Sequence, residues 1–181
     1  MTESEIKFIS GGCRCTGLLC VPSGWRRPTK LPTVVIVPGG KGLRSDAKDG
    51  DCGFGLLELA KSFSRENLAA FCYDGRGQGE SEGERSGHDL AIEDLLSALA
   101  ALRESGDVVD HSRIGLFGQS VGGMASILVA ERDQGVRSLI LWGTLPRYTV
   151  TKTEPEARLA KVLRPTWEKT SKDKSFEEFV R

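Results

Sequence analysis

The sequence predicts an α/β fold, a three-layer αβα sandwich built on a mostly parallel sheet of about six strands. Segments of strand and helix composition alternate along most of the chain, and this alternation requires crossover connections between parallel strands. Residues 33–37 form a continuous β-branched run, which is typical of a strand buried on both faces. Two short β-prone runs, 6–8 and 17–21, flank Gly11 and Gly12 and indicate an antiparallel pair at a sheet edge.

The elements can be placed in order from their hydrophobic periodicity. The run at 33–37 should lie in the middle of the sheet, because a strand without polar positions needs cover on both faces. After it, helices with an apolar stripe alternate with strands, in the order helix 54–66, strand 68–73, helix 89–103, strand 113–117, helix 121–131 and strand 138–142.

The chain divides into a core and a polar tail. Residues 1–145 carry the alternating pattern, whereas residues 146–181 are rich in Lys, Glu and Thr and contain no buried-strand run. We interpret the second segment as the start of a lid or cap, or as a surface extension.

Composition excludes several classes of function. Twenty-five acidic residues balance twenty-five basic ones, and no basic stripe is present, so nucleic acid is not an expected partner. The acidic N-terminus and the short apolar runs predict a soluble, cytoplasmic protein without a membrane span.

The five cysteines have no disulfide-framework or zinc-ligand spacing, so we expect reduced thiols and no metal site. No cofactor is expected either. Gly75 and Gly77 begin a dinucleotide fingerprint, but its third glycine would fall at Glu80.

The strongest chemical signal is a G-x-S-x-G motif between a predicted strand and a predicted helix. Gly118 and Gly122 flank Ser120, and a turn this tight requires glycines because a Cβ would collide with neighbouring backbone. Ser120 should therefore project its hydroxyl at the helix N-terminus as a nucleophile. There the Val121 N–H is free to stabilise an oxyanion. The alternative is a serine in an ordinary glycine-rich turn.

Residues 118–123, together with the D-x-R-G-x-G-x-S segment at 74–81, resemble the α/β-hydrolase superfamily, near its serine aminopeptidase-like and acyl-hydrolase branches. The resemblance covers about residues 6–143. It implies that the 74–81 loop lies beside the active site and shapes it. Asp74 and Arg76 are expected to pair and clamp this turn rather than contact substrate.

The resemblance also implies a second oxyanion donor in the loop after the third strand, where residues 38–42 are rich in glycine. By position, we expect this donor to be the Gly40 N–H, since glycine lets a backbone amide approach the substrate closely. A plain glycine-rich turn remains the alternative.

The triad of this fold places an acid and then a histidine after the nucleophile, but no histidine follows Ser120. His111 precedes the strand that delivers Ser120 and should lie about 20 Å away, at the other end of the sheet. His88 opens a helix on the active-site side. It is the alternative base, against a surface or capping role.

We therefore expect an N-terminal part of a hydrolase domain that lacks its catalytic acid and histidine. The predicted function is hydrolysis of a small-molecule ester, thioester or amide through an acyl-Ser120 intermediate. The alternative is an inactive binding or interaction module. In either case the sixth strand should leave an apolar sheet edge that can pair with a second copy or another chain.

Overall fold

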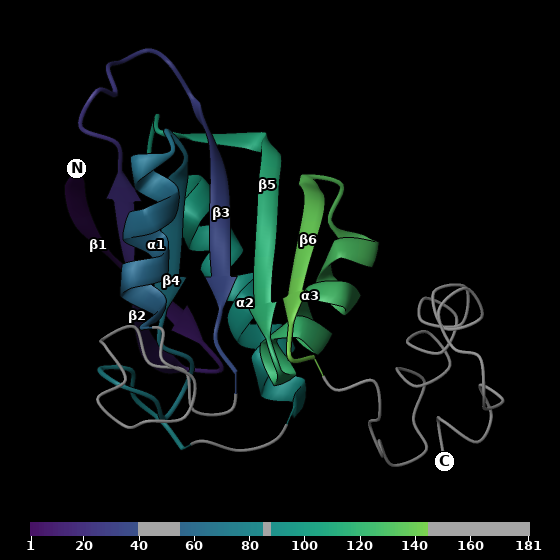
Figure 1. The fold of residues 1–181 in the computed structure, drawn as a ribbon. Helices are drawn as coiled ribbons and strands as arrows, with labels where there is room; N and C mark the ends of the chain where they lie inside the picture. Colours follow the sequence, from purple (N-terminus) through teal and green to yellow (C-terminus); the bar gives the residue numbers. More distant parts are fainter. Residues whose placement is uncertain (40–54, 85–87, 145–181) are drawn as a thin grey trace, which may run out of the picture. The chain divides into compact units, whose positions relative to one another are not determined.

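The computed structural model describes residues 1–39, 55–84 and 88–144. In these ranges a six-stranded sheet has the order β1-β2-β4-β3-β5-β6 and is flanked by three helices (Figure 1). The predicted α/β class and mostly parallel sheet are confirmed. The elements are β1 Thr2–Ser10, β2 Cys13–Val21, β3 Leu31–Val37, α1 Leu56–Arg65, β4 Ala69–Tyr73, α2 His88–Glu104, β5 Val109–Gln119, α3 Val121–Arg132 and β6 Val136–Trp142.

The N-terminal hairpin forms the antiparallel edge that the sequence predicts. Gly11 and Gly12 join β1 to β2 with φ values of 53° and 80°, which glycine adopts without a steric penalty. β2 then pairs antiparallel with β4, and β1 is the outer strand. Both strands extend beyond the predicted runs because their polar residues alternate with buried ones, as in a strand that is half exposed.

Four parallel strands, β4, β3, β5 and β6, make up the rest of the sheet. β3 lies between β4 and β5, and the side chains of Val35 and Ile36 are completely buried. The prediction of a mid-sheet strand is confirmed. Because all four strands run the same way, the loops that follow them lie together at the carboxyl ends of the strands.

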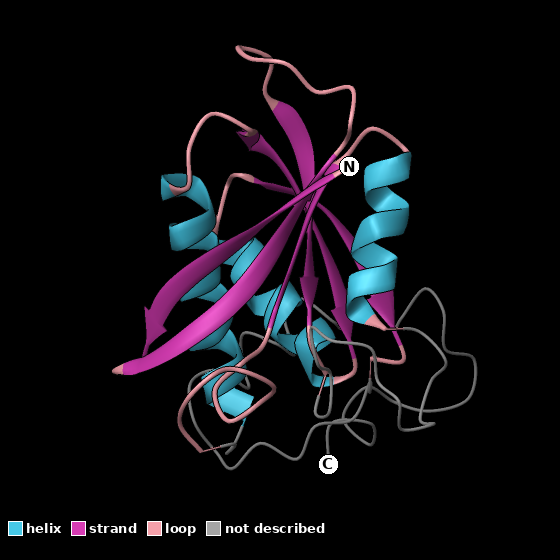
Figure 2. Cartoon of the chain, turned by 90° about the vertical axis from the view of Figure 1, so that its left-hand side faces the viewer, coloured by secondary structure: helices cyan, strands magenta, loops and turns pink. Residues whose placement is uncertain are grey.

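Helices cover both faces of the sheet, which gives the expected three layers (Figure 2). Leu56 and Ala60 of α1 pack on one face against a cluster that includes Ile36 and Cys72. The larger core lies on the other face, where α2 contributes Leu95, Ala98, Leu99 and Leu102 and α3 contributes Ala125 and Val129.

β5 is longer than its predicted range of 113–117. It begins at Val109 because that residue is buried, while the three residues from His111 to Arg113 are exposed at the start of the strand. Apolar periodicity alone does not detect such an exposed strand entry.

Cys13, Cys15 and Cys20 are free thiols. Burial raises the pKa of Cys15 and of Cys20 to about 11, so both are protonated at neutral pH. No helix within the described ranges is both long and apolar enough to cross a bilayer. The expectations for Gly40, Cys52 and residues 146–181 fall outside those ranges.

Candidate active site

The chain turns from strand to helix at Ser120. β5 ends at Gln119 and α3 begins at Val121, so one residue makes the corner. Ser120 has φ 50° and ψ −116°, a conformation that side-chain-bearing residues rarely adopt. Its N–H donates to the Trp142 carbonyl at 3.0 Å, and its carbonyl accepts the Gly123 N–H at 3.0 Å. Hydrogen bonds on both sides therefore hold a strained residue in place, an arrangement that is typical of functional sites.

Gly118 and Gly122 leave no room for a side chain, as the sequence suggests. A Cβ on Gly118 would lie 2.5 Å from the Gly123 Cα and 2.7 Å from the Gly122 carbonyl oxygen. A Cβ on Gly122 would collide with the carbonyl oxygens of Val37 and Pro38. These contacts are with backbone, which cannot move aside as a flexible side chain can.

The corner places Ser120 at the carboxyl end of the parallel strands, where the loops that follow these strands meet. Ser120 is half-buried, whereas residues 122–129 of α3 are buried. Val121 is the first residue of α3, and the N–H groups of a first helical turn have no acceptor within the helix. The positive end of the helix dipole also lies here. The corner can therefore hold an anionic oxygen beside the serine hydroxyl.

The loop after β3 runs directly beside this corner. A Cβ on Gly39 would lie 3.0 Å from the Gln119 carbonyl oxygen and 3.3 Å from the Ser120 Cβ. The Gly39 carbonyl accepts a hydrogen bond from Gln78 Nε2 at 3.3 Å. Two strand-following loops thus meet at Ser120. Gly40, the expected second donor, follows Gly39 and lies outside the described residues.

The loop after β4 is held by buried charges. The Asp74 carboxylate accepts the Glu80 N–H at 3.1 Å, and the Ser81 hydroxyl donates to the Asp74 carbonyl at 2.7 Å. Arg76 Nε donates to Asp94 Oδ1 at 2.6 Å, and its Nη2 donates to Glu93 at 2.7 Å.

The expectation that Arg76 pairs with Asp74 is wrong, because Arg76 pairs with two carboxylates of α2, Asp94 and Glu93. Neither of these carboxylates was predicted from the sequence. The available signal was a charged residue, Asp94, on the apolar stripe of a predicted helix. Its side chain is only 6% exposed, and carboxylates are seldom so deeply buried without a partner.

The two histidines lie where the topology requires. His111 is near the start of β5 and Ser120 follows its end, so they lie at opposite ends of that strand, as expected. His88 begins α2, after the loop that leaves the carboxyl end of β4. That loop starts at the same end of the parallel strands as Ser120. The side chain of His88 is not among the parts that the structure describes.

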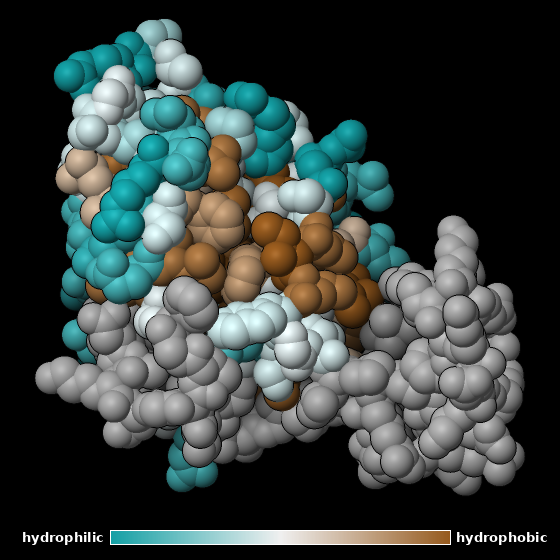
Figure 3. Space-filling model, in the orientation of Figure 1, coloured by the Kyte–Doolittle hydropathy of each residue, from teal (hydrophilic) through white to brown (hydrophobic). Residues whose placement is uncertain are grey.

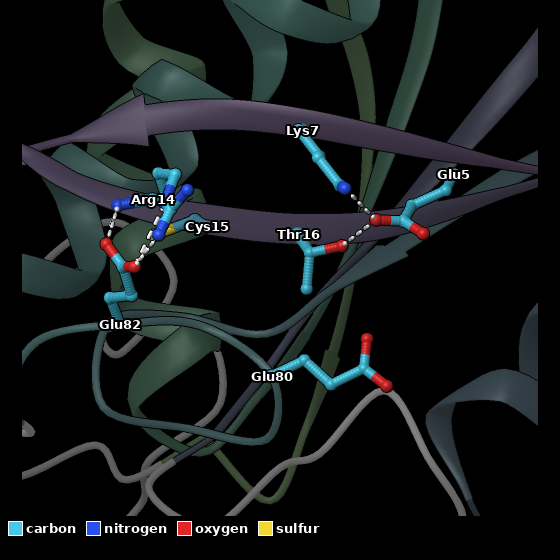
Figure 4. A pocket seen from close by; sticks show the side chains of 7 residues that line it. All are labelled: Glu5, Lys7, Arg14, Cys15, Thr16, Glu80 and Glu82. Atoms are coloured by element: carbon cyan, nitrogen blue, oxygen red, sulfur yellow. Dashed lines mark hydrogen bonds and ion pairs between the residues drawn. The ribbon is translucent and has the colours of Figure 1, made fainter.

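A separate cavity of about 250 Å³ lies between the β1–β2 hairpin and the loop after β4 (Figure 4). Its lining is mostly charged, and Lys7 pairs with Glu5 at 3.4 Å while Arg14 pairs with Glu82. None of its lining residues belongs to the Ser120 corner. The lining comprises Glu5, Lys7, Arg14, Cys15, Thr16, Glu80 and Glu82.

The chain resembles curated proteins of unassigned activity. It is 35% identical over 113 residues to an uncharacterized 31.7 kDa protein of Escherichia coli from the traX-finO intergenic region. The matched region covers 61% of this chain and 36% of that protein, so the chain spans about a third of the relative's length.

Solved α/β-hydrolases share its fold. The hydrolase GrgF from Penicillium sp. sh18 superposes with a TM-score of 0.66 at 24% identity, over 96% of this chain and 57% of that one. Est1E from Butyrivibrio proteoclasticus, solved with ferulic acid bound, gives 0.62 at 21% identity, over 83% and 61%. A serine hydrolase homologue from Coxiella burnetii gives 0.62 at 22% identity, over 88% and 69%.

The sequence model of one hydrolase family, described as serine aminopeptidase, S33, matches residues 54–177. The match begins just before α1, includes the 74–81 loop, the Ser120 corner and β6, and takes in more than half of the chain. The chain therefore belongs to the serine aminopeptidase (S33) family of the α/β-hydrolase superfamily.

Proposed function

We propose that this chain carries the nucleophile of a serine hydrolase that cleaves an ester, thioester or amide through an acyl-Ser120 intermediate. The observation that carries the proposal is the strained backbone of Ser120, held between β5 and α3 with a positive φ. Strain of this kind costs folding free energy, so its presence at a half-exposed serine favours a chemical role. Membership of a hydrolase family favours the same role and a small-molecule substrate.

The proposed chemistry begins with attack of Ser120 Oγ on the carbonyl carbon of the substrate. The hydroxyl proton passes to a general base, and the carbonyl oxygen becomes an oxyanion that the N–H groups of Val121 and Gly40 stabilise. Collapse expels a protonated alcohol, thiol or amine and leaves acyl-Ser120. Water then releases the acid and restores the serine.

The identity of the general base is proposed for the whole protein, because this chain spans only part of the length of its relatives. Neither of the two histidines in the sequence follows Ser120. His88 begins α2, and the loop before it starts at the same end of the parallel strands as Ser120. His111 lies at the opposite end of β5. Of the two, His88 is the one whose position suits a base.

Covalent labelling tests the proposal more sensitively than turnover does. Loss of triad partners lowers kcat by about 10⁴ to 10⁶, whereas labelling by a fluorophosphonate is one irreversible event per molecule, so that even a slow reaction accumulates with time. We expect labelling of the natural chain at Ser120, with peptide mass spectrometry giving the position. Slow hydrolysis of p-nitrophenyl acetate by the same sample should be lost in Ser120→Ala.

The matched control is Ser138→Ala, because Ser138 is an exposed serine on the regular strand β6. This variant should label and turn over like the natural chain. Equal rates of hydrolysis for the natural chain and Ser120→Ala, or labelling that persists in Ser120→Ala, would contradict a nucleophilic role.

A second candidate function is a binding module that assembles through β6. In the described part of the chain, β6 is an edge strand that pairs only with β5, and Leu139, Ile140 and Leu141 are 39–47% exposed. Figure 3 shows apolar side chains gathered on the sheet face beside α1. An exposed apolar edge is a template for strand pairing, and a second copy of this chain supplies a matching strand.

Sedimentation tests this second function. The natural chain should self-associate as its concentration rises, and Ile140→Lys should shift it toward the monomer because a lysine opposes strand pairing at an edge. Arg137→Lys is the matched control, because Arg137 is an exposed and already charged position of the same strand. A natural chain that stays monomeric at high concentration rules out self-assembly through β6.

A further inference from the structure

The segment that follows β6 lies directly beside the Ser120 corner. The last residues of β5 and β6, Gln119 and Trp142, pair in parallel register (Figure 1). The Trp142 carbonyl accepts the Ser120 N–H at 3.0 Å. The next residue, Gly143, has φ 56°, which glycine adopts without a steric penalty, so the chain changes direction as soon as it leaves the strand. This turn decides where Thr144 is placed.

The Thr144 side chain packs on the first turn of α3, at Gly123. A Cβ on Gly123 would collide with Thr144 Oγ1 and would lie 2.9 Å from Thr144 Cβ and 3.0 Å from Thr144 Cγ2. Apart from the helix backbone, these are the three nearest atoms to that position, and all of them belong to one side chain. Thr144 therefore occupies the space that a side chain at position 123 would need.

Gly123 also links the helix to the nucleophile. Its N–H donates to the Ser120 carbonyl at 3.0 Å. A Cβ on Gly118 would lie 2.5 Å from the Gly123 Cα, so the backbones of β5 and α3 are in close contact here. The first turn of α3 is therefore held by β5 and by the Thr144 side chain. Any shift of Gly123 changes the hydrogen bond to Ser120.

The contact between Thr144 and Gly123 depends on shape rather than on hydrogen bonding. Thr144 Oγ1 is buried and has no hydrogen-bond partner among the described residues, so the hydroxyl does not orient the side chain. A side chain that is branched at Cβ has few χ1 rotamers and makes a stiff contact. Valine has the same branched shape, whereas glycine lacks all three atoms that meet Gly123. Substitution can thus separate the shape of Thr144 from its hydroxyl.

The strained backbone of Ser120 needs support of this kind. A side-chain-bearing residue at a positive φ costs folding free energy and persists only where its surroundings over-determine it. We propose that Thr144 is a positioning residue of the nucleophile. By packing on Gly123, it fixes the first turn of α3, and with it the Ser120 backbone and the Val121 N–H. This inference rests on the proposed function and adds the segment after β6 to the site.

The experiment measures inactivation by a fluorophosphonate, in which Ser120 Oγ bonds to phosphorus, fluoride leaves and the hydroxyl proton passes to a base or to solvent. The rate constant kinact and the apparent dissociation constant KI are determined separately, well below the melting temperature of each variant. The single variants are Thr144→Gly, Thr144→Val and Gly123→Ala. The matched control is Thr29→Gly, because Thr29 is an exposed threonine in the loop before β3, at the end of that strand opposite the corner.

We expect Thr144→Gly to lower kinact by about tenfold, because misplacement of a reacting group by about 1 Å can cost about 10² in rate and a loosened turn costs less. The KI should stay close to that of the natural chain, since the buried Thr144 hydroxyl offers the reagent no contact. Thr144→Val, the conservative variant, should rescue kinact because it restores the branched shape.

A double variant tests the contact itself. Gly123→Ala alone should lower both kinact and thermal stability, because the new methyl group meets the Thr144 side chain. In Gly123→Ala combined with Thr144→Gly, the methyl group takes the space that Thr144 leaves. The double variant should therefore be labelled faster than either single variant, which two independent sites cannot produce.

Four results would overturn the inference. If kinact of Thr144→Gly stays within twofold of Thr29→Gly, Thr144 does not position the nucleophile. If Thr144→Val is as slow as Thr144→Gly, packing is not the cause. If the effects of Gly123→Ala and Thr144→Gly simply multiply, the two residues do not act through their contact. If the natural chain is not labelled at Ser120 at all, the proposed function fails and this inference fails with it, whereas the first three results leave the proposed function standing.

Discussion

Arg76 and Asp94 form a buried ion pair that joins the loop after β4 to α2. Arg76 Nε lies 2.6 Å from Asp94 Oδ1, and the two side chains are 8% and 6% exposed. Glu93 adds a second contact to the guanidinium at 2.7 Å, from the exposed side. The pair lies beneath the turn that faces the Ser120 corner, so it links the stability of the core to the geometry of the site.

Asp94→Ala should destabilise the fold strongly. The substitution leaves the Arg76 guanidinium buried with Glu93 as its one charged partner among the described residues, and breaking a buried pair in this way costs about 3–5 kcal/mol. Urea unfolding followed by circular dichroism gives the free energy. Glu82→Gln is the control, since Glu82 pairs with Arg14 at the surface, where a lost ion pair has little effect. Equal stabilities of the two variants would show that the buried pair contributes nothing.

Gly122→Ala should disrupt the corner between β5 and α3. A methyl group at this position meets the carbonyl oxygens of Val37 and Pro38, and we expect a loss of about 3 kcal/mol together with lost labelling of Ser120. Gly24→Ala is the matched control, because its Cβ would meet open space. A Gly122→Ala protein that melts and labels like Gly24→Ala would contradict the packing argument.

Thr144 and Thr33 should respond in opposite directions to replacement by valine. Thr144 Oγ1 is buried and has no partner among the described residues, so Thr144→Val should be neutral or stabilise the chain by about 1 kcal/mol. Thr33 Oγ1 donates to the Leu31 carbonyl at 3.1 Å, so Thr33→Val should cost about 1 kcal/mol. Unfolding free energies that change in the same direction for both variants would count against this assignment.

Asp110 should contribute stability only above a defined pH. Hydrogen bonds from the Ser112 hydroxyl and the Arg113 guanidinium lower the pKa of Asp110 to about 2. Because the folded pKa lies below the unfolded value of about 3.9, the stabilisation is complete above that value and is lost as pH falls from about 4 to about 2. Asp110→Asn should therefore be less stable than the natural chain at pH 6, and the difference should shrink by pH 2.5. Urea midpoints that differ by a constant amount across this range would exclude the effect.

The sequence alone predicted the parts of the fold that depend on local pattern. The buried run at 33–37, the alternation of helices and strands, and the corner at Ser120 follow from side-chain periodicity and from glycine positions, which act over a few residues. The structure confirms the position of β3 in the sheet, the three layers and the strand-to-helix corner. The ends of β1, β2 and β5 were predicted less well, because polar residues at exposed strand positions leave no apolar signal.

Only the tertiary structure revealed which distant residues meet at the site. The Asp94 carboxylate reaches back 18 residues to Arg76 and 84 residues to Ser10, and Gln78 reaches 39 residues to Gly39. Such partners depend on the order of strands in the sheet and on the depth at which each charge is buried. Neither the strand order nor the depth of burial can be derived from the spacing of residues along the chain. A buried charge needs a hydrogen-bond partner, and the packing of the elements decides which residue lies within hydrogen-bond distance.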